Sequence, residues 1–199
     1  RMFALLRLLV DEGCAVTFLD QLHEHRGEYT RQLLLAGVET WWRPWLGDLP
    51  RWLRRHGARF DAIVVSRHYV LSPLLALLRK RAPQAQLVFD TVDLHFLREQ
   101  REAELSGDER TRRAAERSRQ HELALIAAVD RTWVVSPVER ELLASLSPTS
   151  QVDVVATIYE AVEDSPGREG RSDMVFVGSF GHAPNADAAL WLANDILPR

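Results

Sequence analysis

The segment Asp90-Thr91-Val92-Asp93-Leu94-His95 brings two carboxylates and an imidazole close together. Carboxylates accept hydrogen bonds from sugar hydroxyls, and an imidazole titrates near neutral pH and can move a proton. The segment directly follows the apolar residues 86–89, which are typical of a buried strand. Because open α/β sheets bind ligands beyond the carboxyl ends of their strands, Asp93 and His95 are candidate catalytic residues, and Asp90 is a candidate cleft residue.

The same segment also has a purely structural interpretation. Asp90 or Asp93 can cap the helix that follows, since aspartate is a preferred N-cap residue. The residue types alone leave both interpretations open. A metal site is not expected, because the carboxylates do not form an Asp-x-Asp pair and no other ligand cluster accompanies them.

A second polar segment, Ser66-Arg67-His68, follows the apolar residues 62–65. If both apolar runs are parallel strands, Arg67 and His68 lie at the same sheet edge as Asp93. An isolated Arg-His pair is more typical of the exposed start of a helix. The convergence of two strand ends is therefore what makes these residues cleft candidates.

A third segment, Gly178-Ser179-Phe180-Gly181-His182-Ala183-Pro184-Asn185, resembles a turn that cradles a phosphate. Glycines let the backbone approach an anion, and the amides of a following helix are free to bind it. The segment has neither the dinucleotide-binding fingerprint nor the P-loop lysine. A tight connection between a strand and a helix explains it equally well.

Four of the six tryptophans lie close together at positions 41, 42, 45 and 52. They form either a sugar-stacking platform, a membrane-interface contact or part of the core around a strand end, and core packing is the favoured interpretation. Further along, Glu122 lies where a charged helix turns apolar, a position from which it can face the cleft.

Composition excludes several classes of function. A formal charge of -3 provides no basic excess for a nucleic-acid backbone, so nucleic acid is not an expected partner. The single cysteine, Cys14, excludes an internal disulfide and fits a cytoplasmic protein. No apolar run approaches the roughly 20 residues of a membrane span, whereas peripheral contact at the inner membrane face stays open.

Apolar periodicity alternates between about 3.6 and 2 along the chain, which predicts an α/β fold with a doubly wound, Rossmann-like parallel sheet. Ser136-Pro137-Val138-Glu139 has the N-cap, first-turn proline and glutamate of a capping box. Helices are expected at residues 2–10, 29–36, 49–56, 71–81, 97–129 and 185–196 and after Ser136. Strands are expected at residues 15–19, 38–42, 62–65, 86–89, 131–135, 152–156 and 174–177.

The chain divides by composition into two expected domains. Residues 1–159 form an N-terminal Rossmann-like domain that begins on a helix, so its first strand is expected to be missing. Residues 160–173, rich in Gly, Ser, Pro and charge, have the composition of a linker. Residues 174–199 are expected to be the first strand and helix of a second α/β domain.

The order of three motifs resembles that of retaining glycosyltransferases of the glycosyltransferase group 1, glycogen-synthase-like family. These motifs are the segment from Phe89 to Arg98, the segment Trp133-Val134-Val135-Ser136-Pro137-Val138-Glu139, and the segment from Val175 to Ala188. The resemblance covers almost the whole chain.

This resemblance implies a GT-B architecture, in which two Rossmann-like domains face each other across a cleft. It implies sugar transfer from a nucleotide-sugar donor to a sugar or glycan acceptor, in glycan or cell-surface polysaccharide synthesis, with neither a metal nor a bound cofactor. The acceptor side of the cleft would include Arg67, His68, Asp90, Ser136 and Glu139. The donor phosphates would lie near residues 178, 179 and 185 (Gly178, Ser179, Asn185).

Two departures from the family pattern are visible within the chain. Ala156-Thr157 stands where relatives usually have Pro-Asn before the hinge, and the paired donor-site glutamates are not among these residues. Two alternative functions stay open: a sugar-nucleotide epimerase of the same architecture, and a non-catalytic glycosyltransferase-like module.

Overall fold

The computed structural model describes residues 2–159, 167, 169–181 and 183–198. The chain divides into two compact units, residues 1–159 and residues 160–199. The boundary coincides with the end of the expected N-terminal domain. The assignment of acceptor and donor roles to the two parts stays a prediction.

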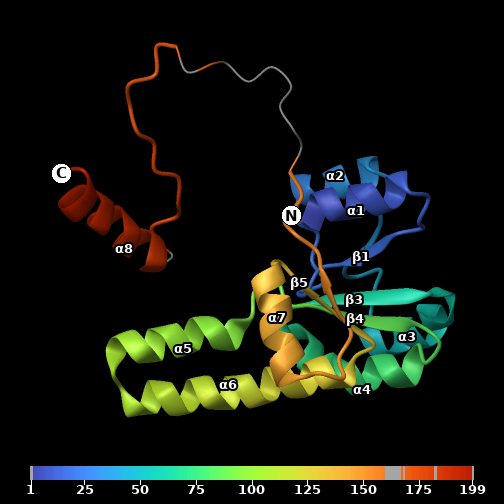
Figure 1. Ribbon diagram of the computed structural model, residues 1–199. Coiled ribbons are helices and arrows are strands. Elements are labelled where there is room, and N and C mark those ends of the chain that lie inside the picture. Colours follow the sequence, from blue (N-terminus) through green and yellow to red (C-terminus); the bar gives the residue numbers. More distant parts are fainter. Residues whose placement is uncertain (1, 160–166, 168, 182, 199) are drawn as a thin grey trace. The chain divides into compact units, whose positions relative to one another are not determined.

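The first unit is an α/β structure with two parallel sheets (Figure 1). Strands β1 (Thr17–Leu19) and β2 (Glu39–Trp41) form one sheet. The other sheet has the order β3-β4-β5-β6 and is parallel throughout, with strands Ala62–Ser66, Gln86–Asp90, Arg131–Val134 and Val152–Val154. The α/β class and the parallel pairing are confirmed. The strands do not form a single continuous sheet. Among the described residues, β1 pairs only with β2 and β3 pairs only with β4.

Helices alternate with these strands, as the periodicity predicts (Figure 1). They are α1 (Met2–Asp11), α2 (Glu28–Leu35), α3 (Leu49–His56), the short 3-10 turn η1 (Gly57–Arg59), α4 (His68–Arg81), α5 (His95–Ser106), α6 (Glu109–Ala128) and α7 (Pro137–Leu146). Helix α3 begins after Asp48, whose carboxylate accepts a hydrogen bond from Arg51 N.

The main core lies around the four-stranded sheet. Phe89 on β4 and Val134 on β5 are fully buried, and Leu71 of α4 and Leu143 of α7 pack into the same cluster. Four consecutive residues of β4 are buried, as expected for a parallel strand that is covered on both faces. A smaller cluster around Leu6, Leu33 and Val38 joins α1 and α2 to the two-stranded sheet.

The expected charged helix at residues 97–129 is two helices. Gly107 ends α5 in the left-handed conformation, with φ 64°, and Asp108 caps α6 by accepting from Thr111 N at 2.9 Å. Figure 1 shows α5 and α6 lying side by side as an antiparallel hairpin. The chain reverses here because glycine adopts positive φ without steric cost.

The N-cap of α7 is confirmed, whereas the Glu139 carboxylate bonds to Val135 N and Ser136 Oγ. Ser136 is the N-cap, its Oγ accepts a hydrogen bond from Glu139 N at 3.2 Å, and Pro137 occupies the first turn. The sequence pattern therefore marks the beginning of this helix correctly.

The second unit contains α8 (Ala183–Trp191) and the π-helical turn η2 (Leu192–Ile196), where the sequence predicts a helix at residues 185–196. The strand expected at residues 174–177 is not formed. A strand needs a neighbour to satisfy its backbone groups, and none of the described residues 167–198 supplies one. Met174, Val175 and Val177 are accordingly exposed. The expected linker falls mostly outside the described residues.

Candidate functional site

The two polar segments singled out in the sequence meet at the carboxyl ends of β3 and β4. Ser66 and Asp90 are partners in the parallel register, and Arg67 N donates to the Asp90 carbonyl at 2.9 Å. The Asp90 carboxylate accepts from Ser66 Oγ at 2.8 Å and is fully buried. Asp90 therefore joins the two strand ends, and its carboxylate is not exposed to a ligand in this arrangement.

Two residues at these strand ends have unusual backbone conformations. Arg67 has φ 77° and the β-branched Val92 has φ 67°, a region that side chains with a Cβ rarely occupy. Strained backbone of this kind persists only where the surrounding contacts hold it, and it is concentrated at functional sites. Val92 lies within the candidate catalytic segment, and Arg67 is hydrogen-bonded to its first residue.

Asp93 is held between two guanidinium groups. Arg67 Nη1 lies 3.0 Å from Asp93 Oδ1, and Arg98 Nη1 lies 2.6 Å from Asp93 Oδ2. The Asp93 side chain is 36% exposed, so it can still meet a ligand. The arrangement fixes the carboxylate in position without removing it from solvent.

Hydrogen-bond chemistry defines the tautomer of His95. Its Nε2 lies 2.9 Å from Glu99 Oε1, and its Nδ1 contacts Arg98 Nη2. Arginine only donates, so Nδ1 is the acceptor and the Nε2–H donates to the Glu99 carboxylate. A carboxylate that orients an imidazole, with the other ring nitrogen free to take a proton, is the arrangement used by general bases. In this structure Arg98 Nη2 donates a hydrogen bond to that nitrogen, His95 Nδ1.

Two further imidazoles, those of His68 and His121, extend the site beside His95. The His68 ring centroid lies 4.6 Å from that of His95 and 6.1 Å from that of His121. Burial, followed by repulsion from His95 and His121, lowers the pKa of His68 below its ordinary 6.5, and Glu99 partly opposes the shift. Among the described residues, His68 Nε2 is buried without a hydrogen-bond partner.

Glu122 of α6 supplies the cap of α5. Its carboxylate, in a side chain only 1% exposed, accepts from His95 N at 3.3 Å and from Phe96 N at 3.0 Å. The interpretation of Asp90 or Asp93 as the helix cap is therefore wrong. Burial raises the pKa of Glu122 to about 7, opposed by the two amides and reinforced by Asp93 and Glu99.

Ser136 and Glu139 connect the end of β5 to this site. Glu139 Oε1 accepts from Leu94 N at 3.2 Å, and its Oε2 accepts from Val135 N at 3.0 Å. The Glu139 carboxylate thus holds the segment before His95 in place. Both candidate residues make the hydrogen bonds of a structural cap and border the site from its α7 side.

The three candidate donor residues lie in the second unit. Asn185 Nδ2 donates to the Ser179 carbonyl at 3.1 Å, and a Cβ added at Gly178 would lie 3.0 Å from Asn185 Nδ2. A side chain at this position would therefore require the Asn185 side chain to shift. The contacts describe a compact turn before α8.

The tryptophan cluster is divided between the core and the surface. Trp52 is 4% exposed, and its ring centroid lies 5.8 Å from that of Trp41 in an edge-on contact. Trp42 meets His25 edge-on, whereas Trp45 is 71% exposed. Core packing explains Trp41 and Trp52 but not the other two.

The sequence interpretation missed Arg98, Glu99 and His121. The first two carried a readable signal, because side chains three and four positions after His95 lie on the same face of a helix. His121 approaches from α6, and its proximity is a tertiary contact that local spacing does not predict.

Neither a metal centre nor a membrane span is found in the part of the chain that the structure describes. No group of three or more His, Cys, Asp or Glu side chains there could hold a metal ion. No described helix is both long and apolar enough to cross a bilayer. The chain matches no protein-family model, no curated protein and no solved structure.

Proposed function

We propose that this chain is the acceptor-side part of a metal-independent glycosyltransferase of the GT-B type, with the beginning of its donor-side part. The observation that carries the proposal is the juxtaposition of Arg67, Asp93 and His95 where β3 and β4 end. Open α/β sheets bind their ligands at this edge. The motif order described above supports the choice of sugar transfer.

In the proposed reaction, Asp93 accepts hydrogen bonds from acceptor hydroxyls while Arg67 holds it in place. His95 Nδ1 takes the proton of the attacking hydroxyl once Arg98 has swung away, and Glu99 keeps the ring oriented. The acceptor oxygen then bonds to the anomeric carbon as that carbon's bond to the nucleoside diphosphate breaks.

The developing negative charge leaves with the diphosphate. The resemblance assigns the donor phosphates to the region of Gly178 and Ser179, whose backbone amides would stabilise this charge. The donor is a substrate of the reaction, so no resident cofactor is invoked. The proposal includes a cytoplasmic location, with the inner membrane face as a site of peripheral contact.

The test measures sugar transfer and donor binding separately in the natural protein. A panel of UDP-, GDP- and ADP-sugars is offered with a mixture of sugar and glycan acceptors, with EDTA present in a parallel series. His95→Ala and Asp93→Asn should each reduce turnover about 10- to 100-fold, with donor Kd changed less than about threefold. Transfer should persist in EDTA.

Glu102→Gln is the matched control, because Glu102 is an exposed carboxylate on the same helix. It should leave both turnover and donor binding unchanged. Near-normal turnover in both site variants, with melting temperatures preserved, would contradict the assignment of Asp93 and His95. Absence of transfer from every donor would contradict the proposed function itself.

A further inference from the structure

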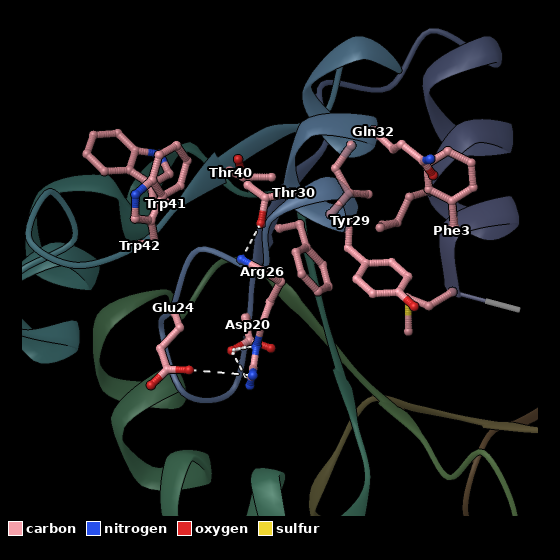
Figure 2. A pocket seen from close by; sticks show the side chains of 14 residues that line it. Phe3, Asp20, Glu24, Arg26, Tyr29, Thr30, Gln32, Thr40, Trp41 and Trp42 are labelled. Carbon is pink, nitrogen blue, oxygen red and sulfur yellow. Dashed lines mark hydrogen bonds and ion pairs between the residues drawn. The ribbon is translucent and has the colours of Figure 1, made fainter. Parts of the chain in front are cut away.

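A cavity of about 410 Å³ lies in the first unit, between α1, α2 and the carboxyl ends of β1 and β2 (Figure 2). None of the residues that carry the candidate catalytic site lines it. Its walls are mainly apolar and aromatic, from Met2, Phe3, Leu6, Phe18, Tyr29, Leu33, Trp41 and Trp42. Small-molecule sites are typically cavities of this size, lined by apolar groups and a few polar ones.

One polar residue of the lining lies on the sheet beneath the cavity. Phe18 and Thr40 are partners in the parallel register, so they lie side by side on one sheet face. Among the described residues, Thr40 Oγ1 is buried and has no hydrogen-bond partner. Rotation about χ1 exchanges the hydroxyl and methyl of threonine, so Thr40 can turn its hydroxyl toward a bound molecule.

The charged residues that line the cavity are Asp20, Glu24 and Arg26. Figure 2 shows Arg26 between Asp20 and Glu24, with guanidinium-to-carboxylate distances of 3.2 and 3.5 Å. Two carboxylates facing one guanidinium leave one net negative charge. Glu24 is 58% exposed, so its carboxylate is available to accept a hydrogen bond from a ligand.

We propose that this cavity binds a neutral alcohol with an aromatic or alkyl body. The rings and aliphatic side chains take the apolar body, since aromatic groups prefer edge-on or offset contact with other rings. A hydroxyl of the ligand pairs with Thr40 or with the carboxylates of the lining. The net negative charge selects against phosphates and carboxylates, which distinguishes this site from one for a nucleotide sugar.

The identification of this ligand as the acceptor of the proposed transferase rests on that proposed function. The binding of this ligand to the cavity does not depend on that function, because affinity can be measured without any turnover. A failure of sugar transfer and a failure of this cavity to bind are therefore separate results.

The experiment titrates the whole chain with 2-naphthol, followed by calorimetry and by quenching of tryptophan fluorescence from Trp41 and Trp42. Three companion probes separate the contributions: naphthalene lacks the hydroxyl, 1-octanol replaces the ring with an alkyl chain, and 2-naphthyl phosphate adds negative charge. We expect saturable binding of 2-naphthol with one site per chain. The phosphate should bind at least about tenfold more weakly.

Two variants test the lining. Thr40→Val keeps the shape and removes the hydroxyl, so 2-naphthol affinity should fall about two- to tenfold while naphthalene affinity is unchanged. Tyr29→Ala removes an aromatic wall from a side chain that is 79% exposed, so the fold should persist while both aromatic probes bind more weakly. Tyr159→Ala, also exposed, is the matched control and should bind normally.

The relative affinities of 2-naphthol and 1-octanol identify the body of the ligand as aromatic or alkyl. Unsaturable binding, tighter binding of the phosphate, or equal affinity of 2-naphthol in the native chain and both variants would each overturn the proposal. Melting curves recorded on all variants show whether any loss of binding is only a loss of the folded state.

Discussion

Glu122 on α6 accepts a hydrogen bond from Phe96 N on α5 at 3.0 Å, and this contact begins the helix that carries His95. The same carboxylate reaches His95 N at 3.3 Å. A buried acid therefore positions the candidate base through its backbone. The protonation state of Glu122 therefore affects the stability of the site.

The first prediction concerns the pH dependence of stability. The pKa of Glu122 is about 7 in the folded chain, compared with an ordinary value of 4.5. Between these values the folded state binds more protons than the unfolded state, so the free energy of unfolding falls as pH rises from about 4.5 to 7. The loss from this group is at most about 3 kcal/mol.

The Glu122→Gln variant cannot titrate, so its stability relative to the native chain should rise across the same pH window. Urea unfolding at a series of pH values from 5 to 8 measures this difference. Glu116→Gln, an exposed change on the same helix, is the control and should follow the native curve. Parallel curves for native chain and Glu122→Gln would rule out the raised pKa.

The second prediction concerns Glu139. Glu139→Ala removes the acceptor for Leu94 N and Val135 N, and the unfolding free energy should decrease by about 2 kcal/mol. Glu141→Ala changes an exposed glutamate of the same helix and should cost less than about 0.5 kcal/mol. Denaturant unfolding measures both. Equal stability of the two variants would show that Glu139 does not hold the strand ends.

The third prediction concerns the imidazole cluster. Burial and the neighbouring rings lower the pKa of His68, so His95→Ala should raise that pKa toward 6.5 by removing one repulsive partner. NMR titration of the His68 ring signals measures it, with His23→Ala as the control, because His23 is not among the groups that shift the pKa of His68. His68 binds a proton more weakly in the folded state than in the unfolded state. The stability that this group contributes above pH 6.5 is therefore lost on acidification. An unchanged His68 titration in His95→Ala would show that the rings are not coupled.

The fourth prediction compares two glycines. A Cβ at Gly57 would overlap the backbone carbonyl oxygen of Arg81, so Gly57→Ala should cost about 2 to 3 kcal/mol through a forced backbone shift. Gly107 has open space around its Cβ position and only its φ of 64° resists substitution, so Gly107→Ala should cost about 1 kcal/mol. Urea midpoints rank the two variants. A larger effect at Gly107 would contradict the described packing of η1 against α4.

Local sequence patterns determined the helices and strands of the first unit and the edge at which its polar residues gather. Each depends on neighbours along the chain: apolar periodicity, the apolar runs before Arg67 and Asp90, and the capping box at Ser136. Even the missed break at Gly107 was readable, because a glycine followed by an N-cap aspartate ends one helix and starts another.

Only the tertiary structure decided how those residues are used. That Glu122 rather than Asp93 caps α5, that Arg67 and Arg98 share Asp93, and that His121 joins the imidazole cluster all depend on contacts between different elements. The division of the strands into two sheets and the unpaired segment at residues 174–177 have the same origin. A strand and a cap exist only where a partner lies within hydrogen-bonding distance, and local periodicity does not specify that partner.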